Sequence, residues 1–156
     1  MFLYNEIKLD APVNLVFDFL SKFENIPLWN YYVMNVWQDN GEQGTLYHQI
    51  RKNDQQTFIV VEESKPNRIK IETTNQKGIR FSRLFQIKQI SKDECVLEDH
   101  FEMDLRQPKF IQNIFKPNIK KAVEENLLKL KQLLENGVTV LQDGRKSYLI
   151  KNKSVR

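Results

Sequence analysis

The sequence predicts an α+β fold in which a curved antiparallel sheet of seven strands is wrapped around one long C-terminal helix. Three observations support this prediction. A long amphipathic segment lies near the end of the chain, and six strand-like segments joined by short turns precede it. A further strand and two short helical segments come before these six. No strand–helix–strand alternation occurs among the six strands, which argues against a parallel doubly wound sheet.

The long helix is expected over residues 117–136. Its apolar residues recur at spacings of three and four, as in a helix that buries one face: Ile119, Val123, Leu127, Leu130 and Leu134. Pro117 suits the first turn because its missing N–H has no partner there. Gly137 favours the left-handed conformation that ends helices. Residues 108–116 are a helical lead-in, and we expect Pro117 to break or kink the path between the two.

The strands follow from alternation and turn signals. Residues 2–9 alternate apolar and polar side chains and predict a half-buried strand. Two short helices come next. The first is capped by Asp10 and has Pro12 in its first turn, and the second ends before Pro27. Six strands are then predicted at residues 31–38, 45–52, 56–63, 68–74, 79–90 and 94–105. A twisted sheet of this size curls, so one long helix can close its concave face.

Composition indicates one globular domain. The chain has 156 residues, of which 40% are hydrophobic, and no apolar run approaches the ~20 residues of a membrane span. The N-terminus shows no signal-peptide pattern. The single Cys95 excludes an internal disulfide and fits a reducing compartment. A cytoplasmic protein is therefore expected.

The positive charge is concentrated in a basic C-terminal extension, residues 137–156. The formal net charge is +4. The extension carries one acidic residue, Asp143, and five basic residues: Arg145, Lys146, Lys151, Lys153 and Arg156. Residues 1–136 are therefore formally neutral. This extension is either a solvated tail or a contact for an acidic partner such as RNA, a ribosome or an anionic membrane.

The same extension predicts a small β-hairpin. Strand-like arms at residues 138–142 and 145–150 flank the two-residue turn Asp143-Gly144. An isolated hairpin is marginal in water. We therefore expect it to pack on the body of the protein or on another chain, as in a homodimer.

The N-terminal pattern resembles a known family. Residues 6–36 contain a strand, an Ala-Pro followed by Val-Phe on a helix, and an Asn-x-Pro-x-Trp segment. The matching positions are Ile7, Ala11, Pro12, Val16, Phe17, Asn25, Pro27 and Trp29. In this pattern the chain resembles START-like proteins of the polyketide cyclase/dehydrase type, also called SRPBCC proteins, which share the helix-grip fold with the birch pollen allergen. Gly44 before a strand and the charged final helix match as well.

The resemblance covers about residues 1–136 and implies a START-like helix-grip domain there. It also implies a hydrophobic ligand of the lipid or polyketide kind. The pattern consists of scaffold residues, and only some members of the family are enzymes. It therefore carries no catalytic residue over to this chain.

Motifs for common cofactors and metals are missing. The sequence has no phosphate-binding loop, no dinucleotide-binding glycine pattern and no zinc spacing. The two histidines, His48 and His100, fall on different predicted strands. No cofactor and no metal site is therefore expected.

A charged pair is predicted on the concave face of the sheet. Arg83 shares the parity of Phe81 and Phe85, and Asp99 shares that of Leu97 and Phe101. The two strands are predicted hairpin neighbours, so Arg83 and Asp99 should lie across from each other or on a diagonal. An unpaired charge there would cost several kcal/mol. The pair is either a structural salt bridge or a ligand-orienting group, with Arg83 binding a carboxylate or carbonyl and Asp99 holding the guanidinium.

Other side chains complete the predicted site. His48 alternates with Leu46 and Ile50 and would face the cavity, either as a general acid or base or as a satisfied imidazole. Tyr47 is the lining residue if the register is the opposite one. The remaining candidate ligand-binding residues are Trp29, Phe85, Phe101, Ile119 and Val123.

Three functions are compatible with these features. The leading hypothesis is a carrier or sensor that binds a small hydrophobic or amphipathic ligand between the sheet and the C-terminal helix. The second is a cyclase- or dehydratase-type enzyme that uses the same cavity. The third is an interaction module with a filled interior, whose basic tail contacts a ribosome or a partner protein. A cavity of several hundred Å³ would favour the first two.

Overall fold

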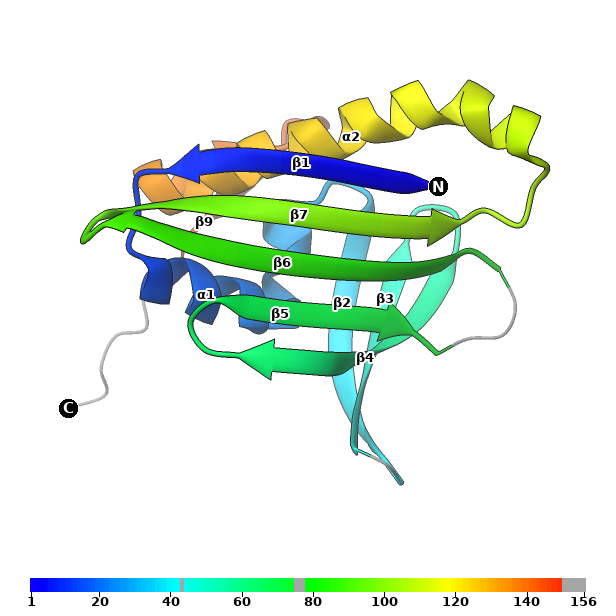
Figure 1. Cartoon of the computed structure of the whole chain (residues 1–156), viewed down its shortest axis with the longest axis horizontal. Helices are drawn as coiled ribbons and strands as arrows, with labels where there is room; N and C mark the ends of the chain where they lie inside the picture. The colour runs from blue at the N-terminus through cyan, green and yellow to red at the C-terminus, as the bar shows by residue number, and fades with distance from the viewer. Residues whose placement is uncertain (43, 75–77, 150–156) are drawn as a thin grey trace.

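The computed structural model describes residues 1–42, 44–74 and 78–149. The chain runs through a strand, two short helices, six strands, a long helix and a two-stranded hairpin (Figure 1). The elements are β1 (Phe2–Leu9), α1 (Val13–Ser21), the 3₁₀ helix η1 (Phe23–Leu28), β2 (Val33–Gly41), β3 (Gly44–Arg51), β4 (Gln55–Ser64), β5 (Arg68–Thr73), β6 (Arg80–Ser91), β7 (Glu94–Asp104), α2 (Lys109–Asn136), β8 (Val138–Val140) and β9 (Lys146–Tyr148). The predicted fold class is confirmed.

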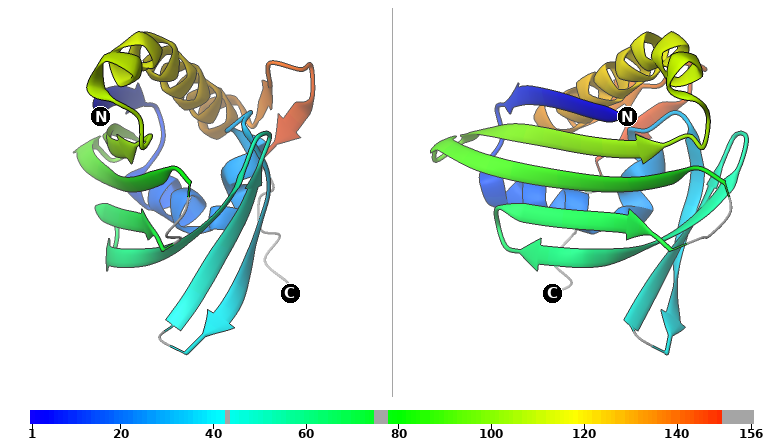
Figure 2. Two further views of the ribbon diagram at one scale, coloured as in Figure 1. Left: turned by 90° about the vertical axis from the view of Figure 1, so that its right-hand side faces the viewer. Right: turned by 45° about the vertical axis from the view of Figure 1, so that its right-hand side comes forward.

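The seven main strands form one antiparallel sheet in the order β1-β7-β6-β5-β4-β3-β2. β2 to β7 are a meander, and β1 pairs with β7, the last strand of that meander. The left view of Figure 2 shows the sheet as a curved wall with α2 across its open side. This arrangement places the concave face of the sheet beneath the helix.

Helix α2 also passes beside β1, the edge strand of the sheet, and two of its lysines donate hydrogen bonds to backbone carbonyls of β1. The ammonium group of Lys131 donates a hydrogen bond to the Lys8 carbonyl at 2.8 Å. The ammonium group of Lys120 donates to the Tyr4 carbonyl at 3.4 Å. An uncovered edge strand exposes such carbonyls to other chains, so these lysines also protect the edge. The carboxylate of Glu135 accepts the Asp10 N–H at 2.8 Å and joins the same contact.

Two helix starts differ from the predictions. α2 begins at Lys109, and Pro117 lies inside it. A proline within a helix removes one N–H bond to the residue four positions earlier, here Asn113, without ending the helix where neighbouring turns hold it. Asp10 does not cap α1: the N-cap position is Pro12, and no side chain makes a capping hydrogen bond there. η1 likewise continues through Pro27.

The C-terminal segment contains an antiparallel pair of strands, β8 and β9. The arms are shorter than predicted, and the connection includes the Leu141 N–H bond to the Arg145 carbonyl rather than a two-residue turn. The pair packs on the end of α2: the Thr139 hydroxyl donates to the Gln132 side chain at 2.7 Å. The basic residues Lys151, Lys153 and Arg156 lie outside the described residues.

In the part of the chain that the structure describes, no helix has the length and apolar character needed to cross a membrane.

Candidate functional site

A cavity of about 550 Å³ lies between the concave face of the sheet and α2. This volume is within the range of small-molecule sites. The walls are mainly apolar side chains from β6, β7 and α2: Phe81, Phe85, Phe101, Met103, Ile119 and Val123. Another hollow, of about 790 Å³, lies over the β2–β3 turn and β4 and is bordered by acidic residues such as Glu62 and Glu63.

The central polar feature of the cavity is the Arg83–Asp99 pair. Arg83 lies opposite Phe101 and Asp99 opposite Phe85 in the β6–β7 register, so the two charges are on a diagonal. Arg83 Nε donates to Asp99 Oδ1 at 2.8 Å, and Nη2 donates to Oδ2 at 2.6 Å. Asp99 is 0% exposed and Arg83 only 9%. This is a buried bidentate ion pair.

Aromatic rings surround the Arg83 guanidinium. Its carbon lies 4.7 Å from the Phe85 ring centroid, 4.8 Å from that of Phe101 and 5.7 Å from that of Trp29. These contacts, with the two bonds to Asp99, fix the position of the guanidinium.

One nitrogen of this guanidinium remains available. Among the described residues, the hydrogen bonds of Arg83 use Nε and Nη2 only. Nη1 is also not among the fully buried atoms that lack a partner, so part of its surface is accessible. Arg83 itself lines the cavity. Asp99 stands behind Arg83 and does not itself line the cavity.

A pair of buried amides forms a second polar point. Gln49 Nε2 donates to Gln56 Oε1 at 2.7 Å, and Gln56 Nε2 donates to the Ile79 carbonyl at 3.4 Å. Both glutamines line the cavity. The sequence analysis missed them, although Gln56 has the parity of the fully buried Phe58.

Asn126 links α2 to the segment after η1. Its amide donates to the Asn30 side chain at 3.1 Å and accepts the Tyr31 N–H at 3.4 Å. Asn126 is 5% exposed and lies within the apolar stripe of the helix. A buried amide in such a stripe is a signal that sequence reading could have used.

His48 does not line the cavity, and its predicted orientation is wrong. Tyr47 pairs with Phe58, and Gln49 pairs with Gln56, so the odd-numbered residues of β3 face inward. His48 lies on the outer face, where Nδ1 is 3.0 Å from the Thr57 hydroxyl and the ring stacks on Trp37. The prediction followed the apolar residues Leu46 and Ile50, which share the parity of His48 and therefore indicated that the even-numbered residues face inward. A shift of one residue moves every side chain of a strand to the other face.

The remaining predicted residues lie together. Trp29, Phe85, Phe101, Ile119 and Val123 all line the cavity beside Arg83. They come from the end of η1, from β6 and β7, and from α2. These five predicted residues therefore come together from four separate segments of the chain.

The structure offers little for covalent or metal chemistry. Burial raises the pKa of the Cys95 thiol, which is 0% exposed and therefore a poor nucleophile. Within residues 1–42, 44–74 and 78–149, no group of three or more His, Cys, Asp or Glu side chains could hold a metal ion.

The fold and the cavity define the chain as a helix-grip protein with a ligand-sized interior. The chain belongs to the family described as polyketide cyclase / dehydrase and lipid transport, whose sequence profile matches residues 3–135. A comparison with curated protein sequences finds no significant match.

Solved structures share the fold at low sequence identity. A protein from Thermus thermophilus aligns with a TM-score of 0.70 and 13% identity, over 86% of this chain and 97% of its own. A START superfamily protein from Mycobacterium smegmatis aligns with a TM-score of 0.64 and 18% identity, over 86% and 94%. The di-domain ARO/CYC protein StfQ of the steffimycin biosynthetic pathway gives 0.66 and 13%, over 86% of this chain and 45% of its own.

Proposed function

We propose that this protein binds a small, mainly apolar molecule that carries one neutral oxygen acceptor, such as a ketone, ester or phenol. The observation that carries the proposal is the ring-packed Arg83, which lines a cavity of about 550 Å³ and whose Nη1 makes no hydrogen bond to the described residues. The apolar part of the ligand would occupy the cavity, and its oxygen would accept a hydrogen bond from Nη1.

The charge balance favours a neutral acceptor over a carboxylate. Asp99 already neutralises Arg83 through two hydrogen bonds. A ligand carboxylate would add an uncompensated negative charge close to Asp99, which is 0% exposed, and such repulsion is costly beside a buried charge. A carbonyl gains a charge-assisted hydrogen bond without that cost.

The guanidinium is also pre-organised. Asp99 and the rings of Phe85 and Phe101 hold it in place before a ligand arrives. Binding therefore does not have to order a flexible arginine, which improves affinity.

Binding without turnover is better supported than a cyclase or dehydratase reaction. Such an enzyme needs a general acid or base close to the ligand. Among the described residues, His48 lies on the outer face of the sheet, and His100 contacts Glu98 and Tyr4 there. Among the described lining residues the ionisable groups are Tyr32, Arg51 and Arg83, and the Trp29 indole and the amides of Asn and Gln complete the polar lining. Tyr32 is therefore the one candidate general acid there, and no carboxylate or histidine accompanies it.

Native mass spectrometry of freshly purified protein, followed by titration with the neutral fluorophore N-phenylnaphthylamine, tests the proposal. Ala122 lines the cavity, so Ala122→Phe should place a ring in it and weaken both retention of the co-purified mass and fluorophore binding. His48→Ala is the matched control and should leave both unchanged. Fluorophore binding that is equal in wild type and Ala122→Phe, or absent from both, would overturn the proposal.

A further inference from the structure

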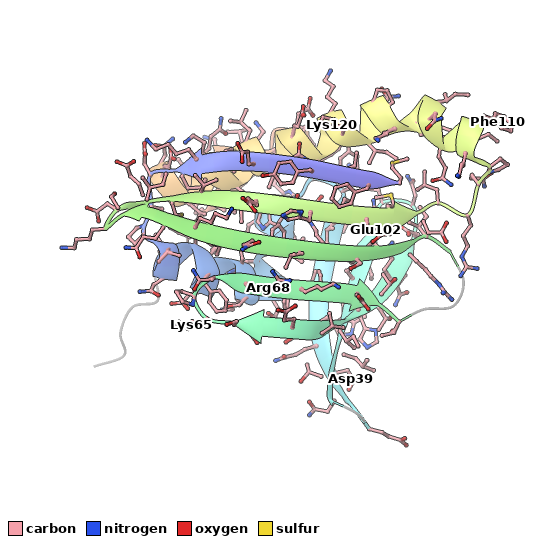
Figure 3. All side chains as sticks on the ribbon, in the orientation of Figure 1. Asp39, Lys65, Arg68, Glu102, Phe110 and Lys120 are labelled. Atoms are coloured by element: carbon pink, nitrogen blue, oxygen red, sulfur yellow. The ribbon has the colours of Figure 1, made fainter. Side chains whose placement is uncertain are left out.

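The first two turns of α2 expose large apolar side chains. Phe110 and Ile114 are each 67% exposed, and Phe115 is 49% exposed. Figure 3 shows Phe110 at the outer end of the helix, beyond the strands and directed away from the sheet. Apolar groups gathered in this way mark an interaction surface.

These side chains form one face of the helix. At about 100° per residue, Phe110, Ile111, Ile114 and Phe115 occupy an arc of roughly 140°. We call these four residues the α2 docking face. The same rotation places Lys109 and Lys116 on the opposite side of the helix. A helix with an apolar face and a lysine-bearing polar face is typical of segments that lie in a membrane interface.

The segment that carries this face has an excess of positive charge, although Lys120 is paired with Glu124 at 3.6 Å. Residues 105–123 contain no Asp or Glu, and they carry five basic residues: Arg106, Lys109, Lys116, Lys120 and Lys121. Residues 1–136 are neutral overall, so this segment carries a local excess of positive charge. Each lysine or arginine near an anionic bilayer adds to the attraction.

The docking face adjoins the cavity. Phe115 belongs to the face and also lines the cavity, and Ile119, one turn further along α2, lines it too. Arg51 at the end of β3 and Asn53 in the β3–β4 connection line the same cavity. The exposed apolar surface is therefore continuous with the interior.

We propose that the N-terminal half of α2 docks on an anionic lipid surface, with Phe110 and Ile114 inserted among the acyl chains and the lysines at the headgroups. Docking does not depend on what the cavity holds. Where the proposed function holds as well, an apolar ligand passes between bilayer and cavity without crossing water.

Flotation of the full-length protein with vesicles tests this. Vesicles of equal parts phosphatidylcholine and phosphatidylglycerol should bind the protein, and vesicles of phosphatidylcholine alone should not. Phe110→Ser with Ile114→Ser should weaken binding about 30-fold, or about 1 kcal/mol per side chain. Met34→Ser with Ile90→Ser is the matched control, because those side chains are 59% and 52% exposed elsewhere, and it should bind as wild type does.

A charge series separates this surface from the C-terminal tail. Lys109→Glu with Lys116→Glu should weaken vesicle binding at least 30-fold, about 1 kcal/mol or more for each lysine, and raised salt should do the same. Lys22→Glu with Lys92→Glu makes the same change elsewhere and should have a much smaller effect.

Three results would overturn the proposal. The first is no binding to anionic vesicles while the fluorophore still enters the cavity, a result that leaves the proposed function intact. The second is binding that only Ala substitutions at Lys151, Lys153 and Arg156 remove. The third is a concentration-dependent dimer that Phe110→Ser with Ile114→Ser abolishes, which would make this face a contact between two copies of the chain.

Discussion

Variants of the Arg83–Asp99 pair can show whether the pair binds a ligand or only stabilises the fold. Arg83→Met removes two hydrogen bonds of 2.8 and 2.6 Å and leaves Asp99 charged at 0% exposure. Removing one partner of a buried ion pair costs about 3–5 kcal/mol. For a domain of this length 1 kcal/mol lowers Tm by about 2–4 °C, so the single variant should melt roughly 6–20 °C below wild type.

The double variant Arg83→Met with Asp99→Leu should recover most of this loss. It removes both charges and leaves two apolar side chains beside Phe85 and Phe101. Replacing a buried ion pair by well-packed apolar residues is often neutral or stabilising. We therefore expect its free energy of unfolding to lie within about 2 kcal/mol of wild type.

Ligand binding should not recover with stability. A hydrogen bond from a charged donor contributes about 1.5–3 kcal/mol, so the double variant should bind a ketone roughly 10- to 150-fold more weakly than wild type. The naphthyl ketone prodan is a suitable probe. N-phenylnaphthylamine, which has no carbonyl, is the matched control and should bind wild type and the double variant equally.

Urea denaturation and fluorescence titration of the same samples decide the question. If the double variant binds prodan as wild type does, Arg83 and Asp99 form only a structural salt bridge. If the double variant is as unstable as Arg83→Met alone, the loss does not come from the stranded Asp99 charge, and the energetic reasoning is wrong.

Two further predictions concern stability. The Lys88 ammonium, 2.6 Å from Glu98, holds the pKa of that carboxyl below its ordinary value against partial burial. A lowered pKa stabilises the fold above the unfolded value of about 4.3 and loses this effect as pH falls through the folded value. Between about pH 5 and 3, the free energy of unfolding measured with urea should therefore fall less steeply for Glu98→Gln than for wild type. An equal fall in both proteins would contradict this. Gly137 ends α2 at φ 78°, with nothing within 4 Å of an added Cβ, so Gly137→Ala should cost only about 1 kcal/mol of left-handed strain, seen as a lower Tm. An unchanged or higher Tm would refute this.

The fold could be predicted because local and global signals agree. The alternation of β6 and β7 and the short turn from Ser91 to Glu94 fix the register of that hairpin. Register then determines which residues share a face. This is why the pairing of Arg83 with Asp99 followed from parity alone.

The orientation of β3 could not be predicted in the same way. Its outer face carries Leu46 and Ile50, while its inner face carries Gln49, so the apolar pattern indicates the wrong side. Gln49 is buried because Gln56 on the neighbouring strand accepts its hydrogen bond. That partner is set by tertiary pairing, which hydrophobic periodicity does not report.

Helix α2 shows a second limit of periodicity. Apolar residues recur at the same spacing throughout residues 119–134. The buried residues of α2 nevertheless begin only at Val123, and those after Asn126 pack as ordinary core. Phe115 and Ile119, in the earlier half, line the cavity instead. The difference lies in what is beneath the helix: Phe115 and Ile119 share the cavity lining with the polar side chains of Arg83, Gln49 and Gln56. A buried polar group needs a hydrogen-bond partner rather than apolar contact, so this part of the concave face does not offer α2 an apolar surface to pack on.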